Sequence, residues 1–532
     1  MNLVSYTSML KFISISAFFL FFFFFPKKES AFAFQHTSET NTKFQEHIVD
    51  STLLAPFAND NLTAFYRLNN FKTVWNNPQN RQLATAILSN ASADGLDAAE
   101  YLSDDLPKLE SKIASLSESE LVQYDISMTL AVQKYLLHMN SGKLNPKKIY
   151  DDWDLTPENF DINKNLTDAI SGDSLAVIFE KIQPKNLVYK RLKNALSILN
   201  AMPVDNLKDV EIVPKLKPNA SHKSIIDLKK RLIYWNDMKP KDSLTAIYDE
   251  ETIKAVKKFQ ARHGLVADGI IGNATITALN TTKEERKQQV IANLERWRWF
   301  PKELADHHII INIPEYKLHT VFKKDTTRTH NIIVGTQMRK TPILYSKLNT
   351  TVFNPTWTVP PTILKEDIIP ETIKNRDYLR KKNIKIYDYK NNVISVWKWN
   401  PEKANNYRYV QSPGTFNSLG MVKILFPNDY AVYLHDTNHK EYFEKTNRSL
   451  SSGCVRVQNP LELTEYLLND STNWNLEKIT ETLKTEKTQN VKIKSDIYIY
   501  QLYWTAWSDC NTLQFRPDIY NLDSELFCLL RN

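Results

Sequence analysis

Apolar and polar positions follow two different periods along this chain, and the period changes near residue 305. Between residues 34 and 215, apolar residues recur every three or four positions, as in LATAILSNASADGLDAAEYL and MTLAVQKYLLHMN. This spacing is typical of amphipathic helices. No cluster of titratable residues stands out in this part, so the pattern predicts a helical scaffold domain.

Residues 221–280 predict a separate small unit of three helices. In the first, SIIDLKKRLIYW, four apolar residues share one face: Ile225, Leu228, Leu232 and Trp235. Asp249 is expected to cap the second helix, ETIKAVKKFQARHG, and Gly264 to end it. TITALN, after the DGIIG turn, is the third.

From residue 305 the chain is rich in β-branched residues and turn residues, which predicts strands in HHIIINIPEYKLHTVF, RTHNIIVGT and NTTVFNPTWTVP. One helix is expected at PLELTEYLLN, with Asn459 as N-cap, Pro460 in first position and Glu462 completing a capping box. Residues 361–408 form a charged insertion that suits a lid, and residues 486–532 a C-terminal β segment. The fold class is therefore multidomain α+β.

The first 33 residues differ from the rest. About 14 apolar residues, FISISAFFLFFFFF, follow Lys11, which is short for a membrane-spanning helix of roughly 20. They suit a secretory signal with Ala31-Phe32-Ala33 as its cleavage site, although Lys27 and Lys28 also leave a retained anchor open. Both readings export the protein.

Charge and cysteine content narrow the function classes. The net charge of +8 is spread over 532 residues without a block of one sign, which argues against a nucleic-acid binder but suits an anionic polymer. Of 3 cysteines, Cys510 and Cys528 lie near each other and are candidates for a disulfide. Cys454 would then be the unpaired thiol.

Cys454 stands in the turn SSGCVRV, and YAVYLH is predicted as a strand that ends at His435. A cysteine nucleophile needs a base, room for a tetrahedral intermediate and donors for the oxyanion. His435 suits the first role and the backbone at Gly453 the others. A buried structural cysteine is the ordinary alternative. Zinc at His435 and His439 is disfavoured because that spacing suits a helix, not a strand and loop, so no metal is expected.

The motifs YLHDTN and RSLSSGCVRV resemble the histidine and cysteine motifs of bacterial L,D-transpeptidases. The match covers His435, Ser451, Gly453, Cys454, Val455 and Arg456. Further blocks, including ERWRWFP, VFNPTWTVPPTI, SLGMVKILFPN and LQFRPDIY, are similar to the large periplasmic branch of that family. Residues 221–280 resemble a peptidoglycan-binding domain, and the N-terminal helices a scaffold domain. The resemblance implies a catalytic domain at 305–485, with its lid at 361–408, completed by 486–532.

The resemblance implies Cys454 as nucleophile, His435 as general base and acid, and Gly453 as part of the oxyanion hole. It also implies that the carbonyl of Asp436 orients the histidine. Supporting or substrate-binding roles follow for a further set: Arg456, Ser451, Ser452, Tyr433, Tyr407 and Trp357. No cofactor is expected.

The implied substrate is peptidoglycan, in which 3→3 cross-links would form between tetrapeptide stems in the periplasm. Carbapenems are expected to acylate Cys454, and glycan polymerases and D,D-carboxypeptidases are candidate partners. Hydrolysis by an L,D-carboxypeptidase, lipoprotein anchoring, and a peptidoglycan-binding protein without turnover remain as alternatives.

Overall fold

The computed structural model describes residues 45–531 apart from residues 58, 104, 151, 152, 154–159 and 212–217. The predicted signal or anchor at residues 1–33 lies outside the described residues. Among the helices that the structure does describe, none combines the length and apolar character needed to cross a bilayer.

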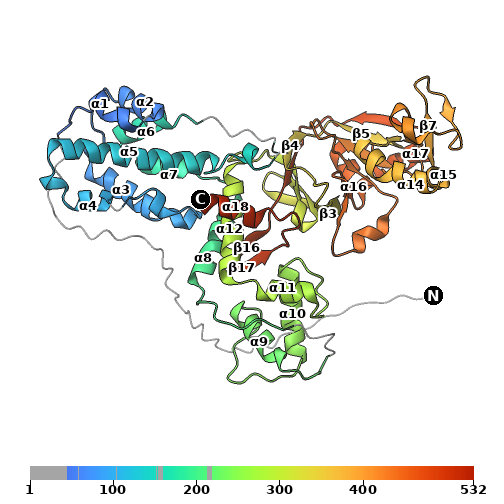
Figure 1. The fold of residues 1–532 in the computed structure, drawn as a ribbon, viewed down its shortest axis with the longest axis horizontal. Helices are drawn as coiled ribbons and strands as arrows, with labels where there is room; N and C mark the ends of the chain where they lie inside the picture. Colours follow the sequence, from blue (N-terminus) through green and yellow to red (C-terminus); the bar gives the residue numbers. More distant parts are fainter. Residues whose placement is uncertain are drawn as a thin grey trace, which may run out of the picture. The chain divides into compact units, whose positions relative to one another are not determined.

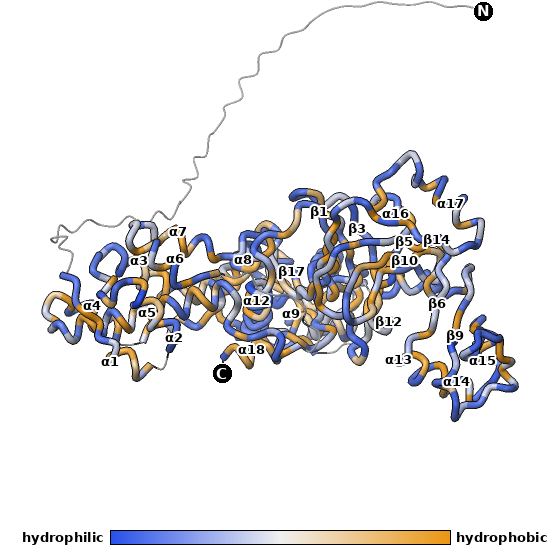
Figure 2. The backbone as a smooth tube through the Cα atoms, turned by 90° about the horizontal axis from the view of Figure 1, so that it is seen from above, coloured by the Kyte–Doolittle hydropathy of each residue, from blue (hydrophilic) through white to orange (hydrophobic). Residues whose placement is uncertain are grey.

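The N-terminal part is helical, as predicted (Figure 1). Its longest helix, α5, begins with a capping box in which Ser117 and Glu120 bond each other's backbone N–H groups. Helices α3, α4 and α6 pack around it, and orange apolar and blue polar segments alternate along these helices in Figure 2. The helices are α1 (Ser51–Leu54), α2 (Asp60–Leu68), α3 (Pro78–Ser89), α4 (Asp105–Ser111), α5 (Glu118–Ser141), α6 (Ile162–Ser171), α7 (Leu175–Lys181) and α8 (Leu187–Ala201).

The predicted three-helix unit is confirmed as α9 (Ser224–Tyr234), α10 (Glu250–Arg262) and α11 (Asn273–Asn280). The Asp249 carboxylate caps α10 by accepting from the N–H of Thr252 at 2.9 Å. Gly264 follows that helix with a φ of +67°, a conformation that favours glycine.

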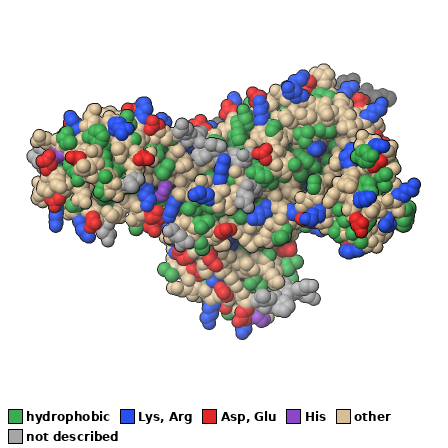
Figure 3. All heavy atoms as spheres, turned by 45° about the horizontal axis from the view of Figure 1, so that its top comes forward, with side chains coloured by type: hydrophobic (Ala, Val, Ile, Leu, Met, Phe, Trp, Pro, Cys, Tyr) green, Lys and Arg blue, Asp and Glu red, His purple; other side chains and the backbone are tan. Residues whose placement is uncertain are grey.

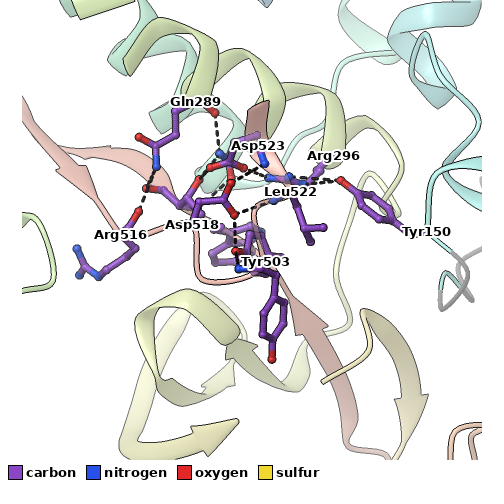
Figure 4. A network of polar contacts seen from close by, with 12 residues as sticks. Tyr150, Gln289, Arg296, Tyr503, Arg516, Asp518, Leu522 and Asp523 are labelled. Carbon is purple, nitrogen blue, oxygen red and sulfur yellow. Dashed lines mark hydrogen bonds and ion pairs between the residues drawn. The ribbon is translucent and has the colours of Figure 1, made fainter. Parts of the chain in front are cut away.

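Helix α12 (Lys283–Arg298) links this unit to the strands. It packs against α5, α8, strand β16 (Ala506–Asp509) and helix α18 (Asp523–Arg531). Its sequence is polar, yet most of its side chains are buried. They are buried in pairs or networks: Arg298 bonds Glu295 at 2.9 Å, and Arg296 is paired with Asp523 near the C-terminus (Figure 4).

Eleven of the described strands after residue 305 form a mixed sheet. Its order is β14-β5-β10-β11-β13-β3-β2-β1-β15-β4, and β12 pairs with β3 beside this path. The strands are β1 (His307–Asn312), β2 (Lys317–Phe322), β3 (Asp325–Gly335), β4 (Leu344–Lys347), β5 (Thr350–Phe353), β10 (Val422–Leu425), β11 (Leu434–His435), β12 (Ser449–Ser451), β13 (Val455–Val457), β14 (Gln489–Lys492) and β15 (Tyr498–Leu502). Together with the helices, this sheet gives the predicted α+β class.

The predicted helix at PLELTEYLLN is confirmed as α16 (Pro460–Leu468). Two further helices, α17 (Leu476–Lys484) and α18 (Asp523–Arg531), were not predicted, so the expected β segment at 486–532 ends in a helix. The last two strands, β16 (Ala506–Asp509) and β17 (Thr512–Phe515), pair with each other and contact α8. The predicted capping box is wrong. Asn459 has a φ of 52° and makes no side-chain cap bond, although Pro460 does begin the helix.

The insertion at 361–408 is more than a charged surface loop. Strands β6 (Trp357–Thr358), β9 (Arg408–Gln411), β7 (Ile384–Tyr387) and β8 (Val393–Ile394) form a second sheet in that order. Helices α13 (Pro361–Ile363), α14 (Ile369–Lys374) and α15 (Asp377–Lys381) accompany it, with a π-helical turn at Leu364–Ile368. Its buried residues, among them Leu379, Ile386 and Trp399, make an apolar cluster separate from the main core. We call residues 357–411 the lid.

Acidic and basic side chains are intermixed over the face of the molecule drawn in Figure 3. This agrees with a modest net charge spread along the chain.

Candidate active site

The two candidate catalytic residues lie at neighbouring strands: His435 ends β11, and Cys454 immediately precedes β13. Strand β11 runs parallel to β13, with Leu434 opposite Val455 and His435 opposite Arg456. The N–H of Val455 donates to the carbonyl of Tyr433 at 3.1 Å, so Cys454 comes level with Tyr433. In-register residues of parallel strands point to the same face, as do positions i and i+2. Cys454, Tyr433, His435 and Arg456 therefore share one face of the sheet.

The strand that carries His435 is shorter than predicted. Only Leu434 and His435 pair as β11, because Ala431 has a φ of 53° and breaks the extended run. The side chain of Asn428 bonds the backbone of Val432 in both directions, at 2.9 and 3.1 Å. Tyr433 and His435 still lie on the same face, as alternate residues of an extended segment do, since their ring centres are 5.6 Å apart.

The His435 ring is held by its own neighbour. Its Nδ1 lies 2.5 Å from the carbonyl oxygen of Asp436, so this nitrogen donates and Nε2 carries no proton in the neutral ring. Burial, followed by the charge of Arg456, lowers the pKa of His435 to about 3. The imidazole is therefore neutral above about pH 4 and has a free acceptor.

The carboxylate of Asp436 has a structural contact of its own. One oxygen accepts from the N–H of Met421 at 2.9 Å, and the other is paired with Lys440. Gly420 leaves room for this group, because a Cβ there would come within 2.3 Å of it. The loop after His435 is thereby fixed to the strand beside it.

The cysteine turn, residues 451–454, is closed by a serine. Ser451 Oγ donates to the carbonyl of Cys454 at 2.6 Å and accepts from the N–H of Gly453 at 3.2 Å. Gly453 has a φ of +111°, where any other residue would be strained. Ser451 is thus committed to the shape of the turn, whereas Ser452 is exposed.

The Cys454 thiol is half-buried, and its sulfur lies 4.0 Å from the carbonyl oxygen of Ala431. Burial raises the pKa of this thiol, while hydrogen bonds from Tyr433 and the charges of Lys423 and Arg456 act in the opposite direction. Burial is the largest of these effects. The resting thiol is therefore protonated at neutral pH.

Of the predicted supporting residues, Tyr433 and Arg456 interact with Cys454, whereas Tyr407 lies in the lid. Tyr433 packs against the lid cluster, and its side chain interacts with both Cys454 and Trp357, so it lies between the lid and the thiol. Tyr407 packs at the edge of the lid cluster instead. Arg456 interacts electrostatically with Cys454 and Tyr442, and burial lowers its pKa. Its Nε is buried without a hydrogen-bond partner in the part of the chain that the structure describes.

Two residues near the thiol were not predicted. Lys423 on β10 lies opposite His435, and its Nζ is 3.9 Å from the centre of the Tyr433 ring. Arg339 donates to Ser452 Oγ at 2.9 Å and to the lid carboxylates Glu366 and Asp367. The only sequence feature that marks Lys423 is its place as a lone charged residue between Val422 and Ile424, both of which are buried.

Other histidine and cysteine candidates lie elsewhere. His439 contacts Glu441 at 3.0 Å and stacks on Tyr442. Cys510 and Cys528 are both exposed and free, so the structure contains no disulfide between them.

Three family models match the chain. Residues 60–196 match a scaffold domain, residues 221–279 a model described as "Putative peptidoglycan binding domain", and residues 306–493 the YkuD model, an L,D-transpeptidase catalytic domain.

Two curated proteins are similar to parts of the chain. A Haemophilus influenzae protein named "Putative L,D-transpeptidase" is 36% identical over 252 residues, 46% of this chain and 50% of its own length. The N-acetylmuramoyl-L-alanine amidase CwlL of Bacillus licheniformis is 38% identical over 73 residues, 14% of this chain and 20% of its own length. The chain therefore spans at most half the length of these relatives.

Two solved L,D-transpeptidase structures also match 55% of this chain. The one from Xylanimonas cellulosilytica is 12% identical, covered over 99% of its length, with a TM-score of 0.18. The one from Stackebrandtia nassauensis is 11% identical, covered over 96%, with a TM-score of 0.20. These scores are too low to support an argument.

The family models confirm the resemblance found in the sequence. Separate parts of the chain match a scaffold domain, a domain described as "Putative peptidoglycan binding domain" and an L,D-transpeptidase catalytic domain of the YkuD family.

Proposed function

We propose that this protein is a peptidoglycan L,D-transpeptidase in which Cys454 is the nucleophile and His435 the general base and acid. The observation that carries the proposal is the pairing of β11 with β13, which sets both residues on one face of the sheet. The Asp436 carbonyl leaves the imidazole with a free Nε2. A neutral thiol and a neutral imidazole on the same face of the sheet suit proton transfer at the moment of attack.

The first half-reaction is acylation. His435 takes the thiol proton as the Cys454 sulfur attacks the carbonyl carbon of the third residue of a tetrapeptide stem. The backbone N–H of Cys454, which belongs to the same peptide unit as the Gly453 carbonyl, receives the oxyanion, since the N–H of Gly453 already donates to Ser451 Oγ. The C–N bond to D-Ala then breaks, its nitrogen takes the proton from His435, and a thioester remains on Cys454.

The second half-reaction transfers the acyl group. The side-chain amine of meso-diaminopimelate in a second stem attacks the thioester carbonyl and gives up a proton to His435. The C–S bond breaks, the thiol regains the proton, and a 3→3 cross-link is formed. Arg456 supports the thiol and the oxyanion by its charge, and Tyr433 and Trp357 form the wall toward the lid.

The remaining parts of the chain suit work on the cell wall. We assign residues 34–215 to a scaffold, 221–280 to holding peptidoglycan, and 305–485 to catalysis beneath a lid. Residues 486–532 complete the catalytic part. The place of action is the periplasm, where both substrate stems are exposed, and carbapenems are expected to acylate Cys454.

Mass spectrometry of residues 34–532 incubated with disaccharide-tetrapeptide tests the proposal, with Cys454→Ala as the matched control. A cross-linked dimer that has lost one D-Ala, formed by the native chain alone, is the expected product. Tripeptide monomer without dimer would indicate hydrolysis instead. Product formation by Cys454→Ala would refute the cysteine mechanism.

A further inference from the structure

One loop touches every residue of the turn that precedes Cys454. This loop, residues 336–341, lies in the connection between β3 and β4. The N–H of Thr336 donates to the carbonyl of Ser451 at 3.0 Å. The Arg339 guanidinium donates to Ser452 Oγ at 2.9 Å, and Thr341 Oγ1 donates to the carbonyl of Gly453 at 2.8 Å. The turn is thus held along its whole length by residues distant in the sequence.

The contact made by Thr341 acts on the peptide unit of the nucleophile. The carbonyl of Gly453 and the N–H of Cys454 belong to the same planar group, so a bond that fixes one also fixes the direction of the other. A hydrogen bond to that carbonyl also polarises the N–H and makes it a stronger donor. Thr341 is almost fully buried, and its hydroxyl in turn accepts from the N–H of Gly335 at 2.8 Å.

The C-terminal segment holds Thr341 in place. The buried hydroxyl of Tyr520 accepts from the N–H of Thr341 at 3.1 Å and donates to the carbonyl of Gly335 at 2.8 Å. Gly335 is required for this approach, because a Cβ there would come within 2.7 Å of the Thr341 nitrogen. Tyr520 lies beyond residue 493, where the match to the catalytic-domain model ends.

Tyr520 is itself tied to helix α12 through a polar network, of which Figure 4 labels Tyr503, Asp518, Asp523 and Arg296. Its N–H donates to the hydroxyl of Tyr503 at 2.9 Å, and that hydroxyl donates to Asp518 at 2.5 Å. Asp518 also accepts from the N–H of Asp523, which is paired with Arg296 on α12 at 2.5 Å. The contacts form a continuous path from α12 to the turn of Cys454.

We infer that Thr341 and Tyr520 are positioning residues that aim the N–H of Cys454 at the oxyanion. The inference rests on the proposed function, in which that N–H is a donor to the tetrahedral intermediate. The C-terminal segment is then a functional part of the site although it lies outside the matched catalytic domain.

Two reagents separate this role from a merely structural one. p-Nitrophenyl acetate acylates a thiol through a tetrahedral oxyanion and releases p-nitrophenolate, whereas iodoacetamide alkylates it by displacement of iodide without an oxyanion. Both rates are measured in a Cys510→Ser, Cys528→Ser background, so that Cys454 is the only thiol. The variants are Thr341→Val, Thr341→Ser and Tyr520→Phe, with Tyr345→Phe on β4 as the control.

Thr341→Val and Tyr520→Phe are expected to lower the acylation rate about 10-fold or more, since single oxyanion donors are worth about 100-fold. The alkylation rate should stay within about 2-fold. Thr341→Ser, which keeps the hydroxyl, and Tyr345→Phe should match the parent in both.

Acylation at the parent rate in Thr341→Val and Tyr520→Phe would overturn the inference, as would an equal fall in both rates. If Thr341→Val fails to fold, Tyr520→Phe decides the matter, because it removes one oxygen and keeps the ring. Neither reagent is a peptidoglycan fragment. Failure of the tetrapeptide reaction in the parent chain would therefore refute the proposed function and leave this test valid.

Discussion

Burial and the neighbouring side chains act in opposite directions on the pKa of Cys454. Burial favours the neutral thiol, while Tyr433, Lys423 and Arg456 favour the thiolate. His435 adds no positive charge, because burial and the neighbouring cations keep its ring neutral. In the resting site, Cys454 is therefore a neutral thiol and His435 a neutral imidazole. They do not form a thiolate–imidazolium pair before substrate binds.

This arrangement predicts the pH dependence of alkylation. The pKa of Cys454 is raised and that of His435 is lowered to about 3, so the thiolate fraction grows continuously as pH rises. The rate of reaction with iodoacetamide should increase steadily from pH 6 to above pH 9 in the Cys510→Ser, Cys528→Ser background. A plateau between pH 6 and 7 would reveal an ion pair and contradict the prediction.

Lys423 is predicted to support the thiolate. Replacing it by methionine removes a nearby positive charge, so the pKa of Cys454 should rise further. A rise of about one unit would slow alkylation at pH 8 about 10-fold. Lys390, which lies 5.5 Å from the centre of the exposed Tyr389 ring in the lid, provides the matched control. Equal rates in Lys423→Met and Lys390→Met would exclude this role.

At the scale of elements, the lid and the cysteine turn are joined through Arg339. Its guanidinium bonds Glu366 at 2.6 Å and Asp367 at 2.7 Å while it also reaches Ser452. An isolated ion pair on the surface adds little to stability. A guanidinium that bonds two carboxylates is held in a defined geometry, and its charge-assisted hydrogen bonds are stronger. Opening of the lid must break these bonds.

Arg339→Gln should therefore loosen the lid. Hydrogen exchange of the amides in residues 364–374 is expected to become about 5- to 10-fold faster, equivalent to roughly 1 kcal/mol of lost closure. Arg380→Gln, which removes an exposed pair with Asp377 inside the lid, should leave the exchange unchanged. Unaltered exchange in Arg339→Gln would show that the lid is held by its apolar contacts.

The sequence predicted elements whose signals are local. Examples are the strands around Ile309 and Ile332 and the helix capped by Asp249. In each of them, the residues that form the pattern lie within about ten positions of one another. The lid sheet was missed because charged residues dominate its first segment. The cap at Asn459 failed because a residue at positive φ does not place its side chain as a cap requires.

The site was predictable in part for the same reason. Cys454, Gly453 and His435 belong to short motifs that can be found without the fold. Lys423, Arg339 and Thr341 reach the site by pairings between distant segments, such as β10 with β11 and the 336–341 loop with the cysteine turn. Those pairings depend on topology, which no spacing in the sequence reveals.

At the scale of the whole molecule, α12 connects the parts through buried polar contacts of its arginines. Arg298 bonds Glu295 and the carbonyl of Asp94 in the scaffold, while Arg296 bonds Asp523. Arg262 of α10 donates to the carbonyl of Leu513 in the C-terminal hairpin. Contacts of this kind cost desolvation and are lost completely when one partner is removed.

Arg296→Met should consequently destabilise the protein by about 3–5 kcal/mol, because it leaves Asp523 buried and uncompensated. The double variant Arg296→Met, Asp523→Asn should recover a large part of that loss. Urea unfolding at pH 7 measures both. A double variant no more stable than the single one would contradict the assignment of the loss to the unpaired carboxylate.

The 336–341 loop also has a consequence for evolution. Its two ends and Arg339 meet the cysteine turn at three points, so adding or deleting one residue would disturb all three contacts. Its exposed residues Gln337, Met338 and Lys340 are free of that constraint, and Met338 is 92% exposed. Among homologous chains, we expect this loop to keep its length while the residues at these three positions vary freely.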